Sequence, residues 1–414
     1  MNLRHWPPTQ HLTLCCNTML DVETALTRTL DLAQPLALER LSLWEAAGRV
    51  LAEPVVASTA LPPFDYSAMD GYALCTADLP NEVAPVLTVQ GESRTGHPAP
   101  MLRASCACRI FTGAALPEGA DCVVMQEQVT RDGDRITLRH TPGPGEHVRR
   151  RGEDLAQGQV AVPEGSRLGA FQLGLIASLN QGHVQVRRLP RVTILCTGDE
   201  LFEPGTAARS NGIPESNSIA LSTLARQAGA EVRRAPFVHD EPEAMLEAIQ
   251  AALAGSDLLL TVGGVSVGDH DLVRPALEHA GAVLDFWKVA MKPGKPLLVG
   301  RCGTTIVLGL PGNPVSAQIT FALFGMPLLR SLQGDRQPRP TLRFACLTHD
   351  VTQRTGRTGY YRAVLDREEV TLVKNQASGA PTSTAWANAL LIMPQQTDQL
   401  AAGAQVEVLA FADL

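Results

Sequence analysis

The chain has 414 residues, 45% of them hydrophobic and 19% charged, which is an ordinary globular composition and enough length for roughly two to four domains. Its formal net charge of −7 excludes a strong positive field for nucleic acid or an anionic membrane. No apolar run suggests a membrane helix, and the N-terminal residues lack the apolar core of a signal peptide, so we expect a cytoplasmic protein.

The nine cysteines are an odd number and are spread over the whole chain. Only Cys15–Cys16 and Cys106–Cys108 are close pairs, and neither has the further Cys or His residues that a zinc site requires. We therefore expect reduced, mostly structural thiols rather than disulfides or a metal site.

The N-terminal part shows helical patterns. Residues 18–31 carry apolar positions at helical spacing, and a second helix is predicted from Ser42, where Ser42 and Glu45 fit a capping box. A third helical pattern lies at 169–180. Between them, residues 60–150 are rich in Pro, Gly, Val and Thr and contain turn pairs, which is typical of a small β domain.

The rest of the chain divides into two further regions. From Arg191, short buried-strand runs alternate with helical patterns, which predicts a doubly wound parallel sheet with helices on both faces. The C-terminal residues are β-rich and predict a small β-barrel or sandwich. The predicted domains are a discontinuous, mainly helical N-terminal domain (1–59 and 153–189), an inserted β domain (60–152), an α/β domain (190–335) and a C-terminal β domain (336–414).

Three of the four lysines fall in one short turn, at Lys288, Lys292 and Lys295, whereas nearly all other positive charges are arginine. Lysine is a compact point charge and arginine a planar fork, so this spacing indicates a site for phosphate or a similar oxyanion. A composition that favours arginine without any functional reason is the alternative.

Acids and glycines occupy the loops that follow the predicted parallel strands, where ligands bind in open α/β sheets. The glycine-rich loop 263–268 is neither a Walker motif nor a dinucleotide fingerprint, but its backbone could hold phosphate. Glu200, Asp240 and Asp271 each follow a different strand and suit Mg²⁺, although such acids also cap helices. For the segment 311–314, Pro-Gly-Asn-Pro, a purely structural turn is a strong alternative.

Seven motifs, in order, resemble one family over nearly the whole chain: FDYSAMDGYA, IFTGAALPEGADCVVMQEQ, RRRGEDL, TGDEL, GGVSVGDHD, MKPGKP and LPGNPVSA. They are similar to the molybdopterin molybdenumtransferases, or MoeA-type proteins, and to the E domain of gephyrin. The resemblance implies four domains, a homodimer and the last step of molybdenum cofactor synthesis. In that step adenylylated molybdopterin and molybdate become molybdenum cofactor and AMP, with Mg²⁺.

By position in those motifs, the resemblance assigns catalytic roles to Asp65, Thr112 and Lys292. Asp65 and Thr112 are expected to face the cleft of the α/β domain across the dimer. The acids assigned to Mg²⁺ and adenylate are Glu200, Asp240 and Asp271. The residues assigned to binding pterin, adenylate or molybdate are Gly263, Gly264, Ser266, Gly268, Lys288, Lys295, Pro311, Gly312, Asn313, Pro314, Arg362 and Ser378.

The chain departs from the family pattern at Tyr66, where Asn is usual, and at Ala377, where Gly is usual. Two other functions remain open. A pterin adenylyltransferase would share the α/β domain but not the β domains, and a scaffold of the gephyrin type would have no catalytic site. Expected partners are the adenylylated pterin, molybdate, the pterin adenylyltransferase and chaperones of molybdoenzymes, with no nucleic acid and no membrane.

Overall fold

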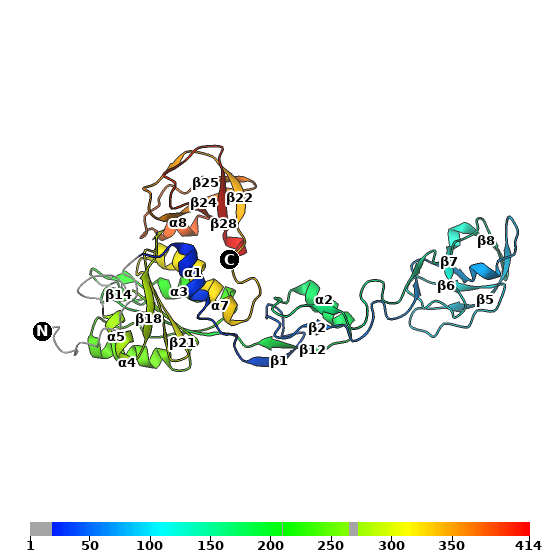
Figure 1. Ribbon diagram of the computed structural model, residues 1–414, viewed down its shortest axis with the longest axis horizontal. Coiled ribbons are helices and arrows are strands. Elements are labelled where there is room, and N and C mark those ends of the chain that lie inside the picture. The colour runs from blue at the N-terminus through cyan, green and yellow to red at the C-terminus, as the bar shows by residue number, and fades with distance from the viewer. Residues whose placement is uncertain (1–18, 209, 265–271) are drawn as a thin grey trace.

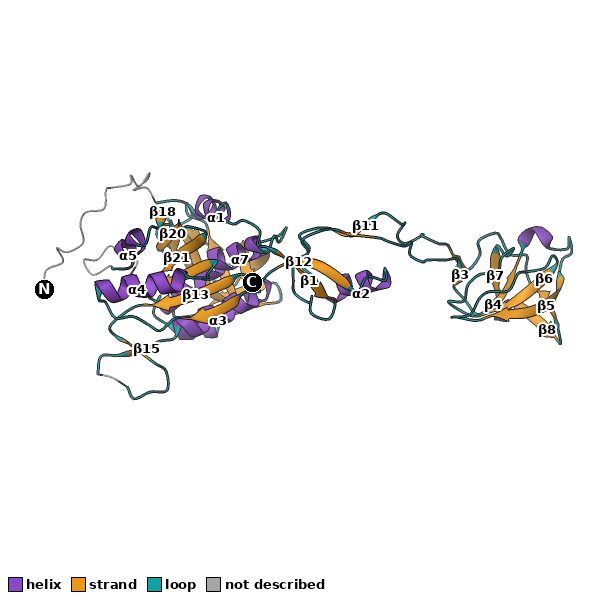
Figure 2. Ribbon diagram, turned by 90° about the horizontal axis from the view of Figure 1, so that it is seen from below, coloured by secondary structure: helices purple, strands orange, loops and turns teal. Residues whose placement is uncertain are grey.

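A computed structural model describes residues 19–208, 210–264 and 272–414. The described chain is elongated (Figure 1). An α/β unit and the C-terminal barrel lie together at one end, a small unit containing α2 lies in the middle, and a β domain lies at the far end. Figure 2 shows the molecule from below, with the same units arranged along one axis. The two ends of this axis carry different groups of the predicted site residues.

The α/β unit is built on a six-stranded sheet in the order β16-β13-β17-β21-β20-β18. The first four strands are parallel, and β20 and β18 are antiparallel to their neighbours. The strands are β13 (Arg191–Cys196), β16 (Glu231–Arg234), β17 (Leu258–Val262), β18 (Val283–Lys288), β20 (Pro296–Cys302) and β21 (Thr305–Leu310). The sheet is therefore mixed, and the prediction of an all-parallel sheet is wrong. The two-residue connection between β20 and β21 can only join antiparallel strands.

Helices cover both faces of this sheet, as predicted. Alternate residues of the buried strands point to opposite sides: Ile194 and Leu260 pack with one set of helices, and Leu195 and Leu259 with the other. The first set is α1 (Val22–Leu30), α3 (Asn217–Gln227), α6 (Pro314–Thr320) and α7 (Met326–Leu332), and the second is α4 (Pro242–Leu253) and α5 (Val273–His279).

Helix α1 confirms the first predicted helix, and Asp21 caps it by accepting from the N–H of Thr24 at 2.9 Å. It packs in the core of the α/β unit. Helices α6 and α7 are joined through a π-helical turn, Phe321–Gly325. Among the described residues, only 314–332 are long and apolar enough to match a membrane span, and 83% of that window is buried inside the protein, as in a core helix.

The middle unit is mostly strand and loop. Strand β1 (Leu38–Ser42) pairs with β12 (His183–Arg187), β2 (Val55–Val56) pairs with β11 (Val160–Val162), and α2 (Ala170–Ser178) confirms the helix predicted at 169–180. The helix predicted from Ser42 is wrong, and so is the mainly helical N-terminal domain.

The error has a local cause. The Ser42 hydroxyl donates to the Glu45 carboxylate at 2.6 Å and the N–H of Glu45 donates to the carbonyl oxygen of Ser42 at 3.1 Å, so the pair closes a single turn after β1 instead of forming a capping box. Gly48, at φ +75°, breaks any helical continuation, because few residues other than glycine adopt that backbone conformation. Pairing of β1 with β12 therefore prevails over the helical pattern.

The β domain confirms the predicted β region. Its six strands lie in the order β7-β4-β6-β5-β9-β8, and its entry and exit segments pair as β3 (Tyr66–Ser67) and β10 (Val148–Arg149). The sheet strands are β4 (Gly71–Leu74), β5 (Val86–Ser93), β6 (Cys106–Ile110), β7 (Cys122–Met125), β8 (Val129–Asp132) and β9 (Arg135–Leu138).

The C-terminal unit is a closed five-stranded barrel, as predicted. Its strands run β24-β25-β22-β28-β26, and β26 pairs back with β24. Their bounds are β22 (Arg343–Leu347), β24 (Thr358–Asp366), β25 (Glu369–Leu372), β26 (Ala389–Met393) and β28 (Gln405–Ala410). A short strand of the α/β unit, β19 (Met291–Lys292), adds to β24 and joins the two units.

Candidate functional site

Loops from four strands meet at the carboxyl edge of the central sheet. The N–H of Thr197, after β13, donates to Val262 at 3.0 Å, and the N–H of Gly263 donates to Leu310 at 3.1 Å. Gly263 has φ +93°, and a Cβ there would lie 2.7 Å from the carbonyl oxygen of Thr197. The glycine is thus required by the close approach of two loops, which leaves backbone groups of 263–264 at the edge.

The acids of this edge come from the first two loops. Glu200 is exposed, and Asp240 is exposed on the loop after β16. Asp199 Oδ1 accepts from the N–H of Asp240 at 3.0 Å and lies 3.2 Å from His239 Nδ1. Asp199 was not among the predicted site residues, although its place in TGDE was a signal. It fixes the loop that carries Asp240.

The third predicted acid, Asp271, lies outside the described residues, as do Ser266, Gly268 and the neighbouring His270. Within the described residues no group of three His, Cys, Asp or Glu side chains could hold a metal. Glu200 and Asp240 supply carboxylate oxygens, the ligand type that Mg²⁺ prefers.

The lysine turn connects β18 to β20. Its ends are joined by the N–H of Val289, which donates to Lys295 at 3.0 Å. The Lys288 amine lies over the Trp287 ring, 3.6 Å from its centre. Lys292 and Lys295 are exposed, and no carboxylate among the described residues forms an ion pair with either. The turn therefore presents positive charge that no described residue neutralises.

Arg362, on β24, is a second unneutralised cation and is only 2% exposed. Its Nε donates to Ser383 at 3.2 Å and its Nη2 to the carbonyl oxygen of Ala377 at 3.3 Å. No carboxylate in the described part of the chain pairs with it. Burial lowers the pKa of Arg362 to about 10, so the side chain is still charged at neutral pH. A buried guanidinium with only neutral partners is suited to an anion.

The loop before α6 faces the barrel. Asn313 Nδ2 donates to the Ser378 hydroxyl at 3.3 Å, and the N–H of Val315 donates to the Ser378 carbonyl at 3.2 Å. Pro311 is buried, and Pro314 is the first residue of α6, as the structural alternative expected. The side chain of Asn313 makes no capping bond to the helix. Besides forming a turn, the segment therefore joins α6 to the loop that carries Ser378.

Asn217, at the start of α3, was missed by the sequence prediction. Its Nδ2 donates to the carbonyl oxygen of Gly312 at 2.9 Å, and only 9% of the residue is exposed. Nothing in the local sequence indicates this contact, because Asn217 and Gly312 lie far apart along the chain.

The two β-domain residues lie elsewhere. Asp65 accepts from the N–H of Arg151 at 2.8 Å and from Arg150 Nη1 at 2.7 Å. The Arg151 N–H and the Arg150 side chain hold the pKa of Asp65 below its ordinary value. Thr112 donates through its N–H and hydroxyl to Asp70 Oδ1, at 2.7 and 2.8 Å. Tyr66, one of the family departures, pairs with Arg149 across β3 and β10.

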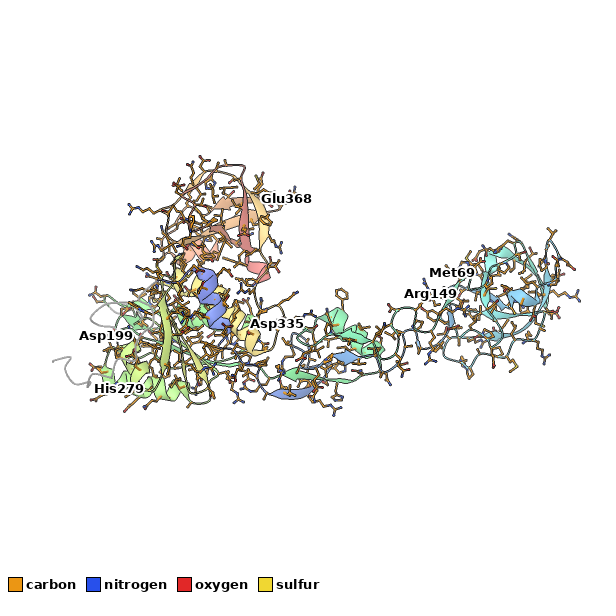
Figure 3. The ribbon with its side chains drawn as sticks, viewed as in Figure 1. Met69, Arg149, Asp199, His279, Asp335 and Glu368 are labelled. Carbon is orange, nitrogen blue, oxygen red and sulfur yellow. The ribbon has the colours of Figure 1, made fainter. Side chains whose placement is uncertain are left out.

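Figure 3 shows Met69 and Arg149 at the far end of the molecule from Asp199. One chain connects the lysine turn to β24, which carries Arg362, and Ser378 to Asn313, and it places the acids on the β13 and β16 loops of the same sheet edge. It does not bring Asp65 or Thr112 to them.

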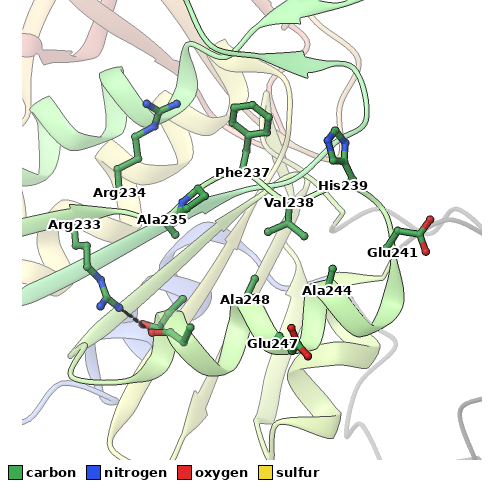
Figure 4. A pocket seen from close by; sticks show the side chains of 13 residues that line it. Arg233, Arg234, Ala235, Phe237, Val238, His239, Glu241, Ala244, Glu247 and Ala248 are labelled. Atoms are coloured by element: carbon green, nitrogen blue, oxygen red, sulfur yellow. Dashed lines mark hydrogen bonds between the residues drawn. The ribbon is translucent and has the colours of Figure 1, made fainter.

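A pocket of about 690 Å³ lies beside this edge, between β16 and α4 (Figure 4). Its wall includes Arg233, whose Nη2 donates to the carbonyl oxygen of Ala251 at 3.0 Å, and Phe237, with alanines of α4 as the floor. None of the predicted site residues lines it. Its lining does include His239 and Glu241, the two neighbours of Asp240, so the pocket adjoins the acidic loop after β16.

Three family models match most of the described chain. Residues 20–180 match the MoeA N-terminal region (domain I and II), residues 193–331 match a "Probable molybdopterin binding domain", and residues 345–411 match the MoeA C-terminal region (domain IV). The three matches follow the same order as the units of the structure.

Curated relatives agree over the full length. A molybdopterin molybdenumtransferase of Haemophilus influenzae is 36% identical and covers 96% of this chain and 100% of its own. A molybdopterin molybdenumtransferase 2 of Mycobacterium tuberculosis is 37% identical and covers 88% and 93%. The crystal structure of a molybdopterin biosynthesis MoeA protein from Pyrococcus horikoshii superposes with a TM-score of 0.84 at 28% identity, covering 95% and 100%.

These matches include both β units, which an isolated molybdopterin-binding domain would lack. The ordered motifs, the fold and the full-length relatives agree, and the chain belongs to the MoeA family of molybdopterin molybdenumtransferases.

Proposed function

We propose that this chain inserts molybdenum into molybdopterin, converting adenylylated molybdopterin and molybdate to molybdenum cofactor and AMP. The observation that carries the proposal is the concentration of unneutralised positive charge where β19 meets β24. Lys292 is exposed on one strand, and Arg362 lies buried on the other. A site for a dianion such as molybdate requires this kind of preorganised charge.

The two kinds of cation serve different tasks. The Arg362 guanidinium is fixed by Ser383 and Ala377, so it can present a rigid fork to an oxyanion. Lys288, Lys292 and Lys295 supply point charges on flexible stems that follow the anion as it moves toward the pterin. The Ser378 hydroxyl, held by Asn313, adds a hydrogen-bonding group at the same junction.

The glycine-rich edge suits the nucleotide half of the substrate. Gly263 and Gly264 lie against Thr197, and Gly312 lies against Gly263, at the sheet edge whose loops carry the exposed Glu200 and Asp240. These oxygen donors fit Mg²⁺, with Asp271 as the third proposed ligand. When bound, Mg²⁺ would offset the negative charge of the diphosphate that links adenylate to the pterin.

We infer that a second copy of the chain completes the site as a homodimer. The β domain, which carries Asp65 and Thr112, lies at the opposite end of the chain from the α/β unit, which carries the lysine turn, so these two residues would reach a transfer site only in another copy. The middle unit also exposes large apolar side chains, with Trp44 at 96% and Phe171 at 90%. Both side chains are accessible to a second copy. Asp65 would there orient water or substrate.

We propose four domains, 1–59 with 153–189, 60–152, 190–335 and 336–414, with α1 of the first packed into the core of the α/β unit. We also place the protein in the cytoplasm, because the seven cysteines of the described residues are free thiols. Its proposed partners are the pterin adenylyltransferase, which supplies the adenylylated substrate, and chaperones of molybdoenzymes, which accept the product.

The test is an assay of purified protein with adenylylated molybdopterin, Mg²⁺ and molybdate. AMP release that depends on molybdate, with formation of molybdenum cofactor, is expected. Nucleotide transfer from ATP that needs no molybdate would instead identify an adenylyltransferase, and absence of both reactions would favour a scaffold.

A further inference from the structure

Glu215 is a carboxylate that is 1% exposed and lies between β15 (Ile213–Pro214) and α3. Its Oε1 accepts from the N–H of Ser218 at 2.8 Å, and its Oε2 accepts from the Ser218 hydroxyl. Arg234 Nη2 lies 3.5 Å from Oε2, and the Cys196 thiol donates to Oε1 at 3.4 Å. Burial, followed by the charge of Glu215, raises the pKa of Cys196, so the thiol keeps the proton that it donates.

These partners belong to three elements that lead into the site. Cys196 is the last residue of β13, directly before the loop with Glu200. Arg234 is the last residue of β16, before the loop with Asp240. Ser218 lies in the first turn of α3. The buried side chain of Glu215 therefore connects the two strand ends from which the acidic loops start to the first turn of α3.

The main chain around Glu215 extends the same connection. Its N–H donates to Phe202 at 2.9 Å, and the N–H of Ile213 donates to the carbonyl oxygen of Glu200 at 2.7 Å, which pairs β14 (Leu201–Phe202) with β15. Two residues on, Asn217 holds the carbonyl oxygen of Gly312. The Asn217 Oδ1 is buried and has no hydrogen-bond partner in the described part of the chain. Leaving a buried amide oxygen unpaired is costly, so this segment is not arranged for stability alone.

A structural cap alone does not require Glu215. Ser216 occupies the N-cap position of α3 and makes no capping bond, although serine is a preferred N-cap residue. The chain instead buries a carboxylate there, at a desolvation cost that a neutral cap would avoid. Unlike a neutral cap, the carboxylate also contacts Arg234 and Cys196, the last residues of the strands before the two acidic loops.

We propose that Glu215 is a positioning residue of the transfer reaction, holding the Glu200, Asp240 and Gly312 loops in the arrangement that the nucleotide half of the substrate requires. The proposal rests on the proposed roles of those loops. Glu215 cannot touch the substrate, because it is covered, and it acts through the groups that it fixes.

The test compares purified full-length wild type with Glu215→Gln, which keeps the size of the side chain and an acceptor for Ser218 but removes the charge. Three readouts are taken: thermal unfolding, steady-state AMP release, and calorimetric binding of AMP with and without Mg²⁺. We expect a folded variant whose kcat falls about 10- to 100-fold, the usual effect of losing a supporting contact. AMP affinity in the presence of Mg²⁺ falls as well, whereas the KM for molybdate stays near the wild-type value, because the lysine turn is not among the contacts of Glu215.

The matched control is Glu203→Gln. Glu203 makes the outer, half-exposed pair with Arg234, at 2.8 and 2.7 Å, and such pairs contribute little. Its kcat and AMP affinity are expected to match wild type. A folded Glu215→Gln protein with wild-type kcat and AMP binding would overturn the inference, as would a loss no larger than that of Glu203→Gln. Wild-type protein that fails to release AMP would overturn the proposed function instead, so the two failures are distinct.

Discussion

Lys292 and Gly359 are partners in a parallel ladder, so the lysine turn of the α/β unit is hydrogen-bonded into the C-terminal barrel. The N–H of Thr358 donates to the carbonyl oxygen of Ala290 at 2.8 Å and fixes the start of this pairing. Gly359 has no room for a side chain, because a Cβ would lie 2.4 Å from the Tyr361 ring. The lysine turn is thereby held at a fixed distance along the strand from Arg362.

The first prediction concerns the charge of Lys292. Lys292→Ala is expected to fold and to lose molybdate-dependent AMP release by about 100-fold or more, because an electrostatic contact to the reacting anion is removed. Lys292→Arg keeps the charge but not its compact shape, so the activity of this variant should lie between that of wild type and that of Lys292→Ala. Stopped assays of AMP formation at several molybdate concentrations measure both variants. Equal activity of wild type and Lys292→Ala would contradict the anion site.

The second prediction concerns the shape of the lysine turn. Gly294 has φ +99°, and a Cβ there would lie 2.3 Å from the Thr320 hydroxyl oxygen. Gly294→Ala should therefore lower the free energy of unfolding by about 1–3 kcal/mol and disturb the anion site. Gly303→Ala is the control, because Gly303 also has a positive φ, +58°, but nothing within 4 Å of its Cβ position. Urea unfolding in which both variants lose the same free energy would show that the clash has no effect.

The third prediction is a pH dependence at the junction of the middle unit and the α/β unit. Asp257 accepts from both ends of the Arg188 guanidinium at 2.7 Å and from the N–H of Arg191 at 2.8 Å. Burial alone would raise its pKa, but the Arg188 and Arg191 donors outweigh burial and hold the pKa below its ordinary value of 3.8. Its stabilising contribution is therefore full above pH 3.8 and is lost as the pH falls through the lowered pKa.

Asp257→Asn should accordingly cost about 1–3 kcal/mol in the free energy of unfolding at pH 7. The gap between wild type and variant should close as the pH falls below 3.8. Glu231→Gln, which removes the exposed contact at 3.7 Å from Arg191, should change stability by at most about 1 kcal/mol. If the difference in free energy of unfolding between wild type and Asp257→Asn stayed constant in acid, the stabilising role of the ionised Asp257 carboxylate would be refuted. Chemical unfolding at a series of pH values provides the measurement.

The sequence predicted the α/β unit, the β domain and the barrel because their patterns are strong. Buried strands such as β13 and β17 alternate with long amphipathic helices, and the barrel strands are short and bounded by turns. The helix from Ser42 failed because a capping signature is local, whereas the pairing of β1 with β12 joins residues more than a hundred positions apart.

The candidate site could be predicted only in part. Lys292, Glu200 and Asp240 stand out by residue type and by their place after strands. Asp199, Asn217 and Glu215 act through contacts to backbone or to other side chains across loops, and no local pattern contains such contacts. The separation of Asp65 from the lysine turn also depends on the arrangement of whole units, which motif order does not reveal.

The central claim is that two copies build each transfer site, one supplying the lysine turn and the other supplying Asp65. Its most direct test is to mix equal amounts of the Asp65→Asn and Lys292→Ala proteins, after subunit exchange, and to measure AMP release. If each variant alone is inactive, half of the exchanged dimers are mixed and each has one intact site, so the mixture should recover about a quarter of wild-type activity. A mixture that exchanges subunits but stays as inactive as its components would contradict the claim.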